Sequence, residues 1–310
     1  MALDVDAPHG VLVVDKPAGP TSHDIVNRVR VALGTRRAGH TGTLDPFATG
    51  VLAVCLGKAT RLVRFLTQGD KVYRATVRLG FATTTDDLMG EPLGAPRLVS
   101  YPPDALADAV RGLTGTFDQV APSFSAKRVE GRRLYERARE GEAVPRTVAR
   151  VTVHALEVLS AEEDCLEVEV VCSPGTYVRA LARDLGEALG SGAHLTALRR
   201  LRSGAFGLEQ AVPGDGLSGS ARGRVLPLSA LLTDFPEVRV GSEGRNALRH
   251  GRDLNRRLIL SGFPESPPAR LRVLDEEGGL LALAVPRGFG VEVGGLPVEP
   301  ILHPDVVLFG

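Results

Sequence analysis

The chain has 310 residues, of which 43% are hydrophobic, and its 37 basic and 37 acidic residues leave no net charge. This composition suffices for one large packed domain and a smaller one, and the lack of any run near the roughly 18–20 apolar residues that span a bilayer excludes a membrane protein. The N-terminal segment MALDVDAPHG has no basic start followed by an apolar stretch, so we expect no targeting signal and a cytoplasmic protein.

The first third of the chain predicts two strands, each followed by a helix. Residues 10–14 are apolar and end at the turn residues DKPAG, which indicates a strand. The next apolar residues recur at helical spacing and predict a helix that Ser22 caps and Gly34 ends. These residues are Ile25, Val26, Val29, Ala32 and Leu33. Residues 51–56 predict a buried strand, and residues 59–66 a short second helix.

The segment KVYRATVRLG predicts a strand with one apolar and one basic face. Its apolar residues alternate with Arg74 and Arg78, and this alternation places Tyr73 with the residues that face the core. A helix is predicted near 103–111. The basic segment that follows, 121–150, contains glycines and prolines and suggests an excursion from the body of the fold.

Residues 148–159 and 165–172 predict a pair of strands joined by an acidic turn. Cys165 and Cys172 are seven residues apart, so within one strand they face opposite ways. With Cys55 they form no Cys-x-x-Cys pair, and we interpret all three as buried thiols rather than zinc ligands.

The segment SPGTYVRALARDLGEALG predicts a helix with Tyr177 and Arg179 at its entry. The apolar side of this helix carries Val178, Leu181, Leu185 and Leu189. The Gly/Ser/Arg-rich residues 214–224 indicate a linker, and from about 236 onward short strands and turns predict a small β-rich module. Strands and helices mix irregularly rather than as βαβ repeats, which favours the α+β class.

Charge is distributed unevenly along the chain. Residues 28–74 contain nine Lys or Arg against Asp45 and Asp70, and residues 121–150 contain eight against four glutamates. Residues 157–169 contain six acids and no Lys or Arg. The distribution predicts a basic face and an acidic back, which would suit a polyanion such as a nucleic acid.

One carboxylate, Asp45, lies in the glycine-containing stretch RAGHTGTLDPFATG. A lone carboxylate in such a loop can be a nucleophile, a general base or a metal ligand. A metal is disfavoured, because the loop has no second acid and His40 alone supplies no coordination set. Without further information, Asp45 could also be a turn or N-cap residue before Pro46.

Two other enzyme classes compete for the same carboxylate. Aspartyl-phosphate enzymes also carry a TGT motif, but their aspartate precedes it, whereas here it follows. A glycosidase requires a second carboxylate nearby. Asp15, Asp87 and Asp184 are candidates for that partner, but the sequence does not place them.

The stretch RAGHTGTLDPFATGVLAVCLGKATRL closely resembles the signature of the TruB family, the pseudouridine synthases that modify uridine 55 in the T-arm of tRNA. Further motifs similar to those of the family follow in family order over residues 10–206. They are GVLVVDKPAGPTSHD, KVYRATVRLG, TTTDDLMG, LYERAREG, SPGTYVRALARDLGEALG and GAHLTALRRLRSGAF. The C-terminal segment resembles the family's PUA-like RNA-binding module more weakly.

The resemblance implies an α+β catalytic domain over 1–230 with a central, mostly antiparallel sheet. It also implies a thumb insertion over about 121–150 and a PUA-like, β-rich RNA-binding domain over 236–310. The implied activity is isomerisation of uridine to pseudouridine in the T-arm of tRNA after base flipping, with no cofactor, no metal and no obligate protein partner, by a monomer. The alternative from another class is a non-catalytic tRNA-binding or tRNA-folding protein that keeps the same cleft.

The resemblance also implies roles for individual residues. Asp45 matches the nucleophile, Tyr73 the tyrosine that stacks on the target base and takes a proton, and Arg179 the arginine that pairs with the catalytic carboxylate. Further implied substrate contacts are His40 in the space left by the flipped nucleotide, Tyr177 and Leu198 in the pocket, and Lys16 in the pocket or on a phosphate.

The basic segment matches the family's thumb, which implies contacts with the RNA backbone. The residues concerned are Lys127, Arg128, Arg132 and Arg133. The segment departs from the family pattern at Ser123, Phe124 and Lys127, which puts the packing of the thumb in doubt rather than the chemistry.

Overall fold

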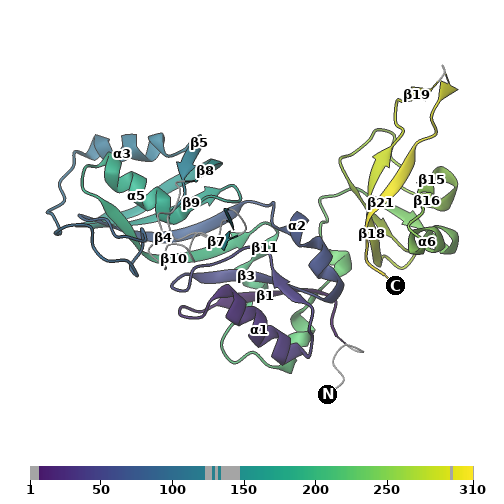
Figure 1. Cartoon of the computed structure of the whole chain (residues 1–310), viewed down its shortest axis with the longest axis horizontal. Helices are drawn as coiled ribbons and strands as arrows, with labels where there is room; N and C mark the ends of the chain where they lie inside the picture. The colour runs from purple at the N-terminus through teal and green to yellow at the C-terminus, as the bar shows by residue number, and fades with distance from the viewer. Residues whose placement is uncertain (1–6, 123–127, 130–131, 134–146, 294–295, 310) are drawn as a thin grey trace.

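The computed structural model describes residues 7–122, 128–129, 132–133, 147–293 and 296–309. Within these residues, one sheet has eleven strands and a second has six, and helices cover part of the larger one (Figure 1). The mixture confirms the α+β class.

The larger sheet follows the order β12-β1-β3-β10-β4-β9-β8-β5, with β2, β11 and β13 paired at its side. Its strands are β1 (Gly10–Lys16), β2 (Ala38–His40), β3 (Thr49–Leu56), β4 (Lys71–Leu79), β5 (Gly115–Val120), β8 (Val148–Glu162), β9 (Cys165–Cys172), β10 (Ala193–Ser203), β11 (Phe206–Gly207), β12 (Val212–Pro213) and β13 (Leu226–Pro227). Only the β1–β12 and β3–β10 pairs among these are parallel, so the sheet is mostly antiparallel as predicted.

The smaller sheet follows the order β15-β21-β18-β17-β14-β16. Its strands are β14 (Glu237–Val240), β15 (Leu254–Asn255), β16 (Ile259–Ser261), β17 (Leu271–Leu274), β18 (Leu280–Arg287) and β21 (Ile301–Val307). Two further ladders pair β6 (Arg128–Val129) with β7 (Arg132–Arg133) and β19 (Glu292–Val293) with β20 (Leu296–Pro297). The helices are α1 (Ser22–Leu33), α2 (Val63–Leu66), α3 (Pro103–Gly112), α5 (Val178–Ala188) and α6 (Ser242–Arg249).

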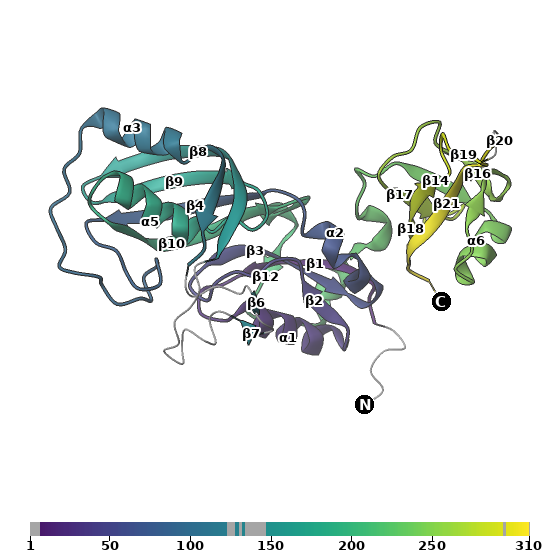
Figure 2. The same cartoon turned by 45° about the horizontal axis from the view of Figure 1, so that its top comes forward.

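Both faces of the larger sheet are buried around β1 and β3, which explains their unbroken apolar runs. Leu12 and Val14 face one core, into which α1, α3 and α5 pack. Val11 and Val13 face a second core, which includes α2 and strands β18 and β21 of the smaller sheet. Figure 2 shows α1 below the sheet at β1 and β3, and α5 against β4, β9 and β10.

Helix α1 confirms the predicted span but not the predicted N-cap. The hydroxyl of Thr21, not Ser22, accepts the hydrogen bond from the backbone N–H of Asp24, and the Asp24 carboxylate accepts one in return, which makes a capping box. The helix ends at Gly34, whose φ of 65° is the left-handed conformation that glycine adopts at low cost. Ser22 is buried and has a different role in the site described below.

Burial alternates along β4 as the sequence predicts, and Tyr73 is 9% exposed on the inner face. The free thiols follow the prediction at Cys55 and Cys172, which are buried, but not at Cys165, which faces the opposite side of β9 and is only half-buried.

Two predictions about the larger sheet were wrong. Residues 214–224 are not a linker: the strands on either side of them pair with β1, and the 3-10 helix over Gly219–Arg224 packs against α1 through Ala221. The acidic segment 157–169 does not form a separate acidic back. It lies beside the basic face of β4, where Arg74 pairs with glutamates of β9 and Arg78 with Asp164.

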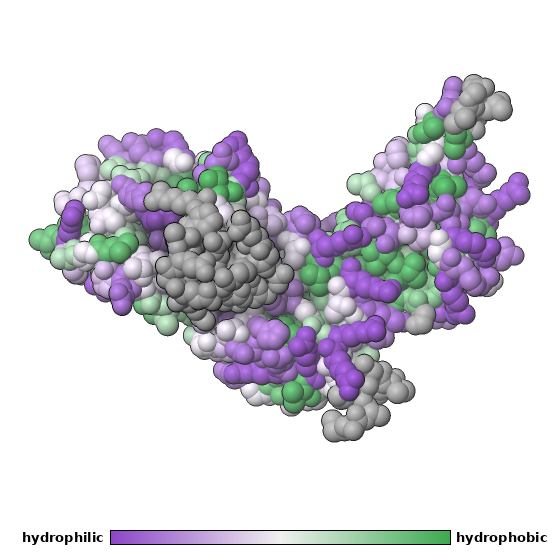
Figure 3. Space-filling model, in the orientation of Figure 1, coloured by the Kyte–Doolittle hydropathy of each residue, from purple (hydrophilic) through white to green (hydrophobic). Residues whose placement is uncertain are grey.

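The smaller sheet has a core of its own, and an ion pair between Arg64 and Asp305 ties it to the larger body. The carboxylate of Asp305 on β21 lies 2.9 Å from a guanidinium nitrogen of Arg64 on α2 and 2.8 Å from one of Arg270. Figure 3 shows hydrophilic side chains over much of both lobes on one face of the molecule, with apolar areas broken up between them. Within the described residues, no helix is long and apolar enough to cross a membrane.

Candidate active site

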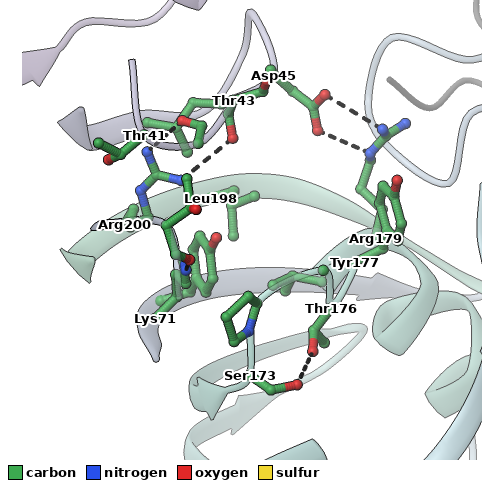
Figure 4. A pocket seen from close by; sticks show the side chains of 17 residues that line it. Thr41, Thr43, Asp45, Lys71, Ser173, Thr176, Tyr177, Arg179, Leu198 and Arg200 are labelled. Carbon is green, nitrogen blue, oxygen red and sulfur yellow. Dashed lines mark hydrogen bonds and ion pairs between the residues drawn. The ribbon is translucent and has the colours of Figure 1, made fainter. Parts of the chain in front are cut away.

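A pocket of about 320 Å³ opens where the loop after β2 meets β4, β10 and the start of α5. This volume lies at the lower end of the range for small-ligand clefts. The residues that line it are Thr41, Gly42, Thr43, Leu44, Asp45, Thr67, Lys71, Tyr73, Ser173, Pro174, Gly175, Thr176, Tyr177, Val178, Arg179, Leu198 and Arg200. Figure 4 shows Asp45 and Arg179 facing each other on one side, with Arg200 and Lys71 on the opposite side.

The loop that carries Asp45 is held by buried hydrogen bonds on both sides of that residue. The Ser22 hydroxyl donates to the carbonyl of Leu44 at 3.0 Å and accepts from its N–H at 2.8 Å. After Asp45, the ammonium of Lys16 donates to the carbonyl oxygens of Pro46 at 3.1 Å and Ala48 at 2.7 Å. These bonds fix the backbone before any substrate is present.

Lys16 therefore does not lie where the sequence reading placed it. Its side chain is fully buried beneath the loop, is not among the residues that line the pocket, and is bonded to carbonyl oxygens. Burial lowers the pKa of Lys16 to about 8, while the nearby carboxylate of Asp45 opposes this. The position suits a residue that supports the loop rather than one that contacts a phosphate.

The carboxylate of Asp45 is paired with Arg179. The distances from Asp45 Oδ2 to Arg179 Nε and from Oδ1 to Nη2 are 3.0 and 3.4 Å, a two-point contact. The guanidinium is 6% exposed, and its Nη1 also lies 3.3 Å from the carboxylate of Asp87 and donates to the carbonyl of Thr85 at 3.0 Å. Arg179 thus connects the Asp45 loop with the loop that contains Asp87.

Burial raises the pKa of Asp45 above the ordinary value for an aspartate. Arg179 opposes this shift most strongly, Asp87 adds to it by charge repulsion, and Lys16 opposes it more weakly. The carboxylate is partly desolvated but paired with a guanidinium, an arrangement suited to a nucleophile.

Tyr73 forms part of the pocket wall, and Arg200 lies beside its hydroxyl. Burial raises the pKa of Tyr73 further above 10, and Arg200 opposes this by its charge and by a hydrogen bond. Leu198, on β10, and Tyr177, at the N-cap of α5, also line the pocket. Gln119 holds Tyr177 in place by bonding both its backbone N–H and its carbonyl.

The other residues predicted from the sequence lie outside the pocket or outside the described side chains. His40 is half-buried on β2, where its Nδ1 accepts a hydrogen bond from the N–H of Gly42 at 3.3 Å, and it does not line the pocket. Lys127 lies outside the described residues. Arg128, Arg132 and Arg133 belong to the paired strands β6 and β7, and the structure describes their backbone but not their side chains.

Three charged residues of the site were not predicted as such. Arg200, 2% exposed, donates to the carbonyl oxygens of Val51, Thr43 and Gly42. Lys71 lines the pocket and donates to carbonyls of the turn before β4. The sequence suggests Asp87 only as the second carboxylate of a glycosidase. The two-residue period of the strands could have predicted the two basic residues, because Lys71 lies on the same strand face as Tyr73, and Arg200 on the same face as Leu198.

Taken together, the pocket offers a carboxylate held by a guanidinium, an aromatic ring and an apolar side chain around one cavity. Such a site suits a planar ring that stacks on the tyrosine while the carboxylate attacks an adjacent atom. Within the described residues, no three His, Cys, Asp or Glu side chains group in a way that could hold a metal ion.

Comparison with protein families finds two adjoining matches. Residues 30–178 match the model of the TruB family pseudouridylate synthase N-terminal domain, and residues 179–222 that of the tRNA pseudouridylate synthase B C-terminal domain. Among curated proteins, the chain is 45% identical to tRNA pseudouridine synthase B of Thermobifida fusca over 89% of this chain and 94% of that protein. It is 41% identical to that of Ralstonia nicotianae over 95% and 94%.

Solved structures also match most of the chain, at lower sequence identity. The chain aligns with a chain of a Cbf5-Nop10-Gar1 complex at 28% identity and a TM-score of 0.70, over 97% of this chain and 85% of that one. It aligns with a chain of an H/ACA RNP bound to a substrate RNA containing 2′-deoxyuridine at 26% identity and a TM-score of 0.69, over 97% and 86%.

Proposed function

The chain belongs to the TruB family of pseudouridylate synthases, and from this premise we propose that it converts uridine 55 in the T-arm of tRNA to pseudouridine with Asp45 as the nucleophile. Relatives that are 40–45% identical over most of the chain are tRNA pseudouridine synthases, so the enzyme isomerises uridine in tRNA. The observation that carries the assignment of residues is that Asp45, Tyr73 and Arg179 line one pocket.

The reaction breaks the C1′–N1 bond of the target nucleotide and forms a C1′–C5 bond. The base must leave its stack to enter the pocket, which costs a few kcal/mol that contacts with the protein must offset. Asp45 attacks the target nucleotide, the C1′–N1 bond breaks and the freed ring turns and rejoins the ribose through C5. The bond to Asp45 then breaks, which returns the free carboxylate. The proton on C5 is then lost and N1 gains one, so the atoms of substrate and product balance.

Each neighbour of Asp45 has a defined part in this proposal. Arg179 orients the carboxylate and favours its ionised form, which offsets the effect of burial. Tyr73 stacks on the base and takes the C5 proton as its hydroxyl gives up its own proton, and Leu198 and Tyr177 exclude water from the ring. Lys16 holds the loop from below, and His40 occupies the space that the flipped base leaves in the RNA.

Labelled RNA provides the test. T-arm RNA carrying tritium at uridine C5 should release tritium with the wild-type protein and not with Asp45→Asn, while both proteins bind the RNA with similar affinity. The matched control is Asp118→Asn, which removes an exposed carboxylate that pairs with Arg150 on the surface. Binding without release by the wild type would favour the non-catalytic tRNA-binding alternative, and release by Asp45→Asn would remove that residue from the mechanism.

Residues 1–230 act as the catalytic domain and residues 236–310 as a PUA-like RNA-binding domain in this proposal. The separate core of the smaller sheet supports this division. The thumb, about 121–150, contacts the RNA backbone through its basic residues. Neutralising Arg132 and Arg133 together should weaken RNA binding and flatten its dependence on salt concentration, because fewer counterions are released. An unchanged slope would contradict the thumb assignment.

The enzyme acts as a monomer in the cytoplasm, where its tRNA substrate is found. Sedimentation of the free protein and of its complex with tRNA would test this, with one protein per tRNA expected.

A further inference from the structure

The loop over residues 83–90 presents two successive acids, Asp86 and Asp87, to two successive turns of α5. Asp87 lies 3.3 Å from Arg179, and Asp86 lies 3.0 Å from Arg183, which is four residues further along the same helix. Residues four apart lie one above the other on a helix face, so the two arginines form a column against the loop. The proposed mechanism uses Arg179 but assigns nothing to Arg183.

Asp87 is held in place by its own loop. Its Oδ1 accepts hydrogen bonds from the Thr85 hydroxyl at 2.6 Å and from the N–H of Met89 at 2.9 Å, which leaves Oδ2 to face Arg179. In the part of the chain that the structure describes, the hydrogen bonds include none from this loop to the Asp86 carboxylate. Its backbone has a φ of 60°, a left-handed conformation that is uncommon outside glycine.

Arg183 holds the Asp86 carboxylate from outside the loop. Besides Asp86, its guanidinium contacts the Asp184 carboxylate at 2.8 Å and donates to the carbonyl of Val120 at 3.0 Å. These contacts anchor Arg183 to the end of β5. Its side chain is 19% exposed and that of Asp86 is 12% exposed, so little water competes for the pair.

The charges of this region are unbalanced, because two guanidinium groups face four carboxylates. The carboxylates are those of Asp45, Asp86, Asp87 and Asp184. Burial raises the pKa of Asp86, and Arg183 opposes that shift first and Arg179 second. Arg179 therefore already interacts with Asp86, which would compete with Asp45 for Arg179 if Arg183 were removed.

We infer that Arg183 is a positioning residue for the reaction: by pairing with Asp86 it keeps that carboxylate off Arg179 and so keeps Arg179 on Asp45. This inference rests on the proposed function, in which Asp45 must be oriented by Arg179. It concerns a residue that contacts neither Asp45 nor the pocket.

The experiment compares Arg183→Gln, Asp86→Asn and the double variant by tritium release from T-arm RNA. Arg183→Gln should lower kcat by about tenfold or more, which corresponds to about 1.4 kcal/mol, with KM for RNA little changed. Asp86→Asn should remain close to the wild type, because asparagine also tolerates the left-handed conformation. The double variant should return to within about threefold of the wild type, because no surplus carboxylate remains to draw Arg179 away.

A purely structural role for Arg183 predicts the opposite for the double variant, because losing both partners would disturb the loop at least as much as losing one. A double variant no faster than Arg183→Gln would therefore overturn the inference, as would a wild-type kcat for Arg183→Gln. If Arg183→Gln does not fold, Arg183→Lys with and without Asp86→Asn gives the same comparison, and the added substitution should raise kcat.

The matched control is Arg111→Gln, which breaks an exposed ion pair with Asp108 on α3 and should leave kcat unchanged. The proposed function has its own readout in the same assay. If the wild-type protein releases no tritium, the function fails, whereas normal release by the wild type and by Arg183→Gln alike refutes only the role of Arg183.

Discussion

The two sides of the pocket hold their arginines in different ways. Arg179 faces the carboxylates of Asp45 and Asp87, whereas Arg200 faces the backbone carbonyls of Gly42, Thr43 and Val51. A guanidinium on a carboxylate sets the charge and direction of a reactive group, while one on carbonyl oxygens ties segments of backbone together. Substitution of Arg179 should therefore lower mainly the rate of catalysis, and substitution of Arg200 mainly the stability of the fold.

The largest effect expected from this comparison is that of Arg179→Lys on catalysis. Lysine keeps the charge but cannot contact both oxygens of Asp45 while also bonding Thr85 and Asp87. We expect kcat to fall by about a hundredfold or more, or about 2.7 kcal/mol of transition-state stabilisation, with a small change in unfolding free energy. Single-turnover tritium release measures kcat and urea unfolding of the same preparation measures stability, with Arg111→Lys, an exposed arginine of α3, as the control.

Arg200→Gln should show the reverse pattern. It leaves buried carbonyl oxygens without their donor, so we expect the unfolding free energy to fall by about 2–3 kcal/mol. Catalysis should fall less than in Arg179→Lys when it is assayed well below the unfolding temperature. Urea unfolding checks this, and Arg202→Gln is the control, because Arg202 is exposed on the same strand. A stability loss no larger than that of the control would contradict the comparison.

Lys16 also lies beneath the Asp45 loop on backbone carbonyls, and its titration makes its contribution measurable. Its pKa is about 8 in the folded protein and 10.5 in the reference state, so between these values the unfolded chain binds more protons at this residue. The contribution of Lys16 to the unfolding free energy should therefore rise as pH increases from about 8 to 10.5 and be lost as pH falls through 8.

The measurement is the difference in unfolding free energy between the wild type and Lys16→Met across this range. The difference is needed because burial raises the pKa of Cys55 to about 12 and of Cys172 to about 11, which lowers stability with rising pH in both proteins. A difference independent of pH would show that Lys16 does not titrate in this window.

The smallest effect expected is that of Asp45→Asn on stability. Because the pKa of Asp45 is raised in the folded protein, its stabilising contribution is present below the unfolded pKa of about 3.8 and is lost as pH rises through the folded value. At pH 7 the ionised carboxylate therefore serves the reaction but no longer stabilises the fold. We expect Asp45→Asn to be as stable as the wild type or more stable in thermal unfolding at pH 7, although inactive. A clear loss of stability would show that the pair with Arg179 contributes more than burial costs.

Several features of the fold and the site follow from the sequence because they depend on backbone period or on local chemistry. The two-residue period of β4 places Tyr73 inward, and Gly34 ends α1 because it adopts a left-handed conformation. The motif around Asp45 and the helix entry at Arg179 could both be identified from residue order, although they are 134 residues apart. Local pattern thus predicted the elements, and the resemblance to the family named the principal residues.

The tertiary structure decided which of these residues meet. Sequence could not show that Lys16 lies beneath the loop, that Thr21 rather than Ser22 caps α1 while Ser22 bonds Leu44, or that residues 214–224 pack back onto the sheet. Nor could it show that Asp86 and Asp87 divide between two arginines of α5. Apart from the capping box of Thr21 and Asp24, which is local, these contacts join residues distant in sequence. They form only when strands and helices pack, because packing rather than local period sets their distances and removes the water between them.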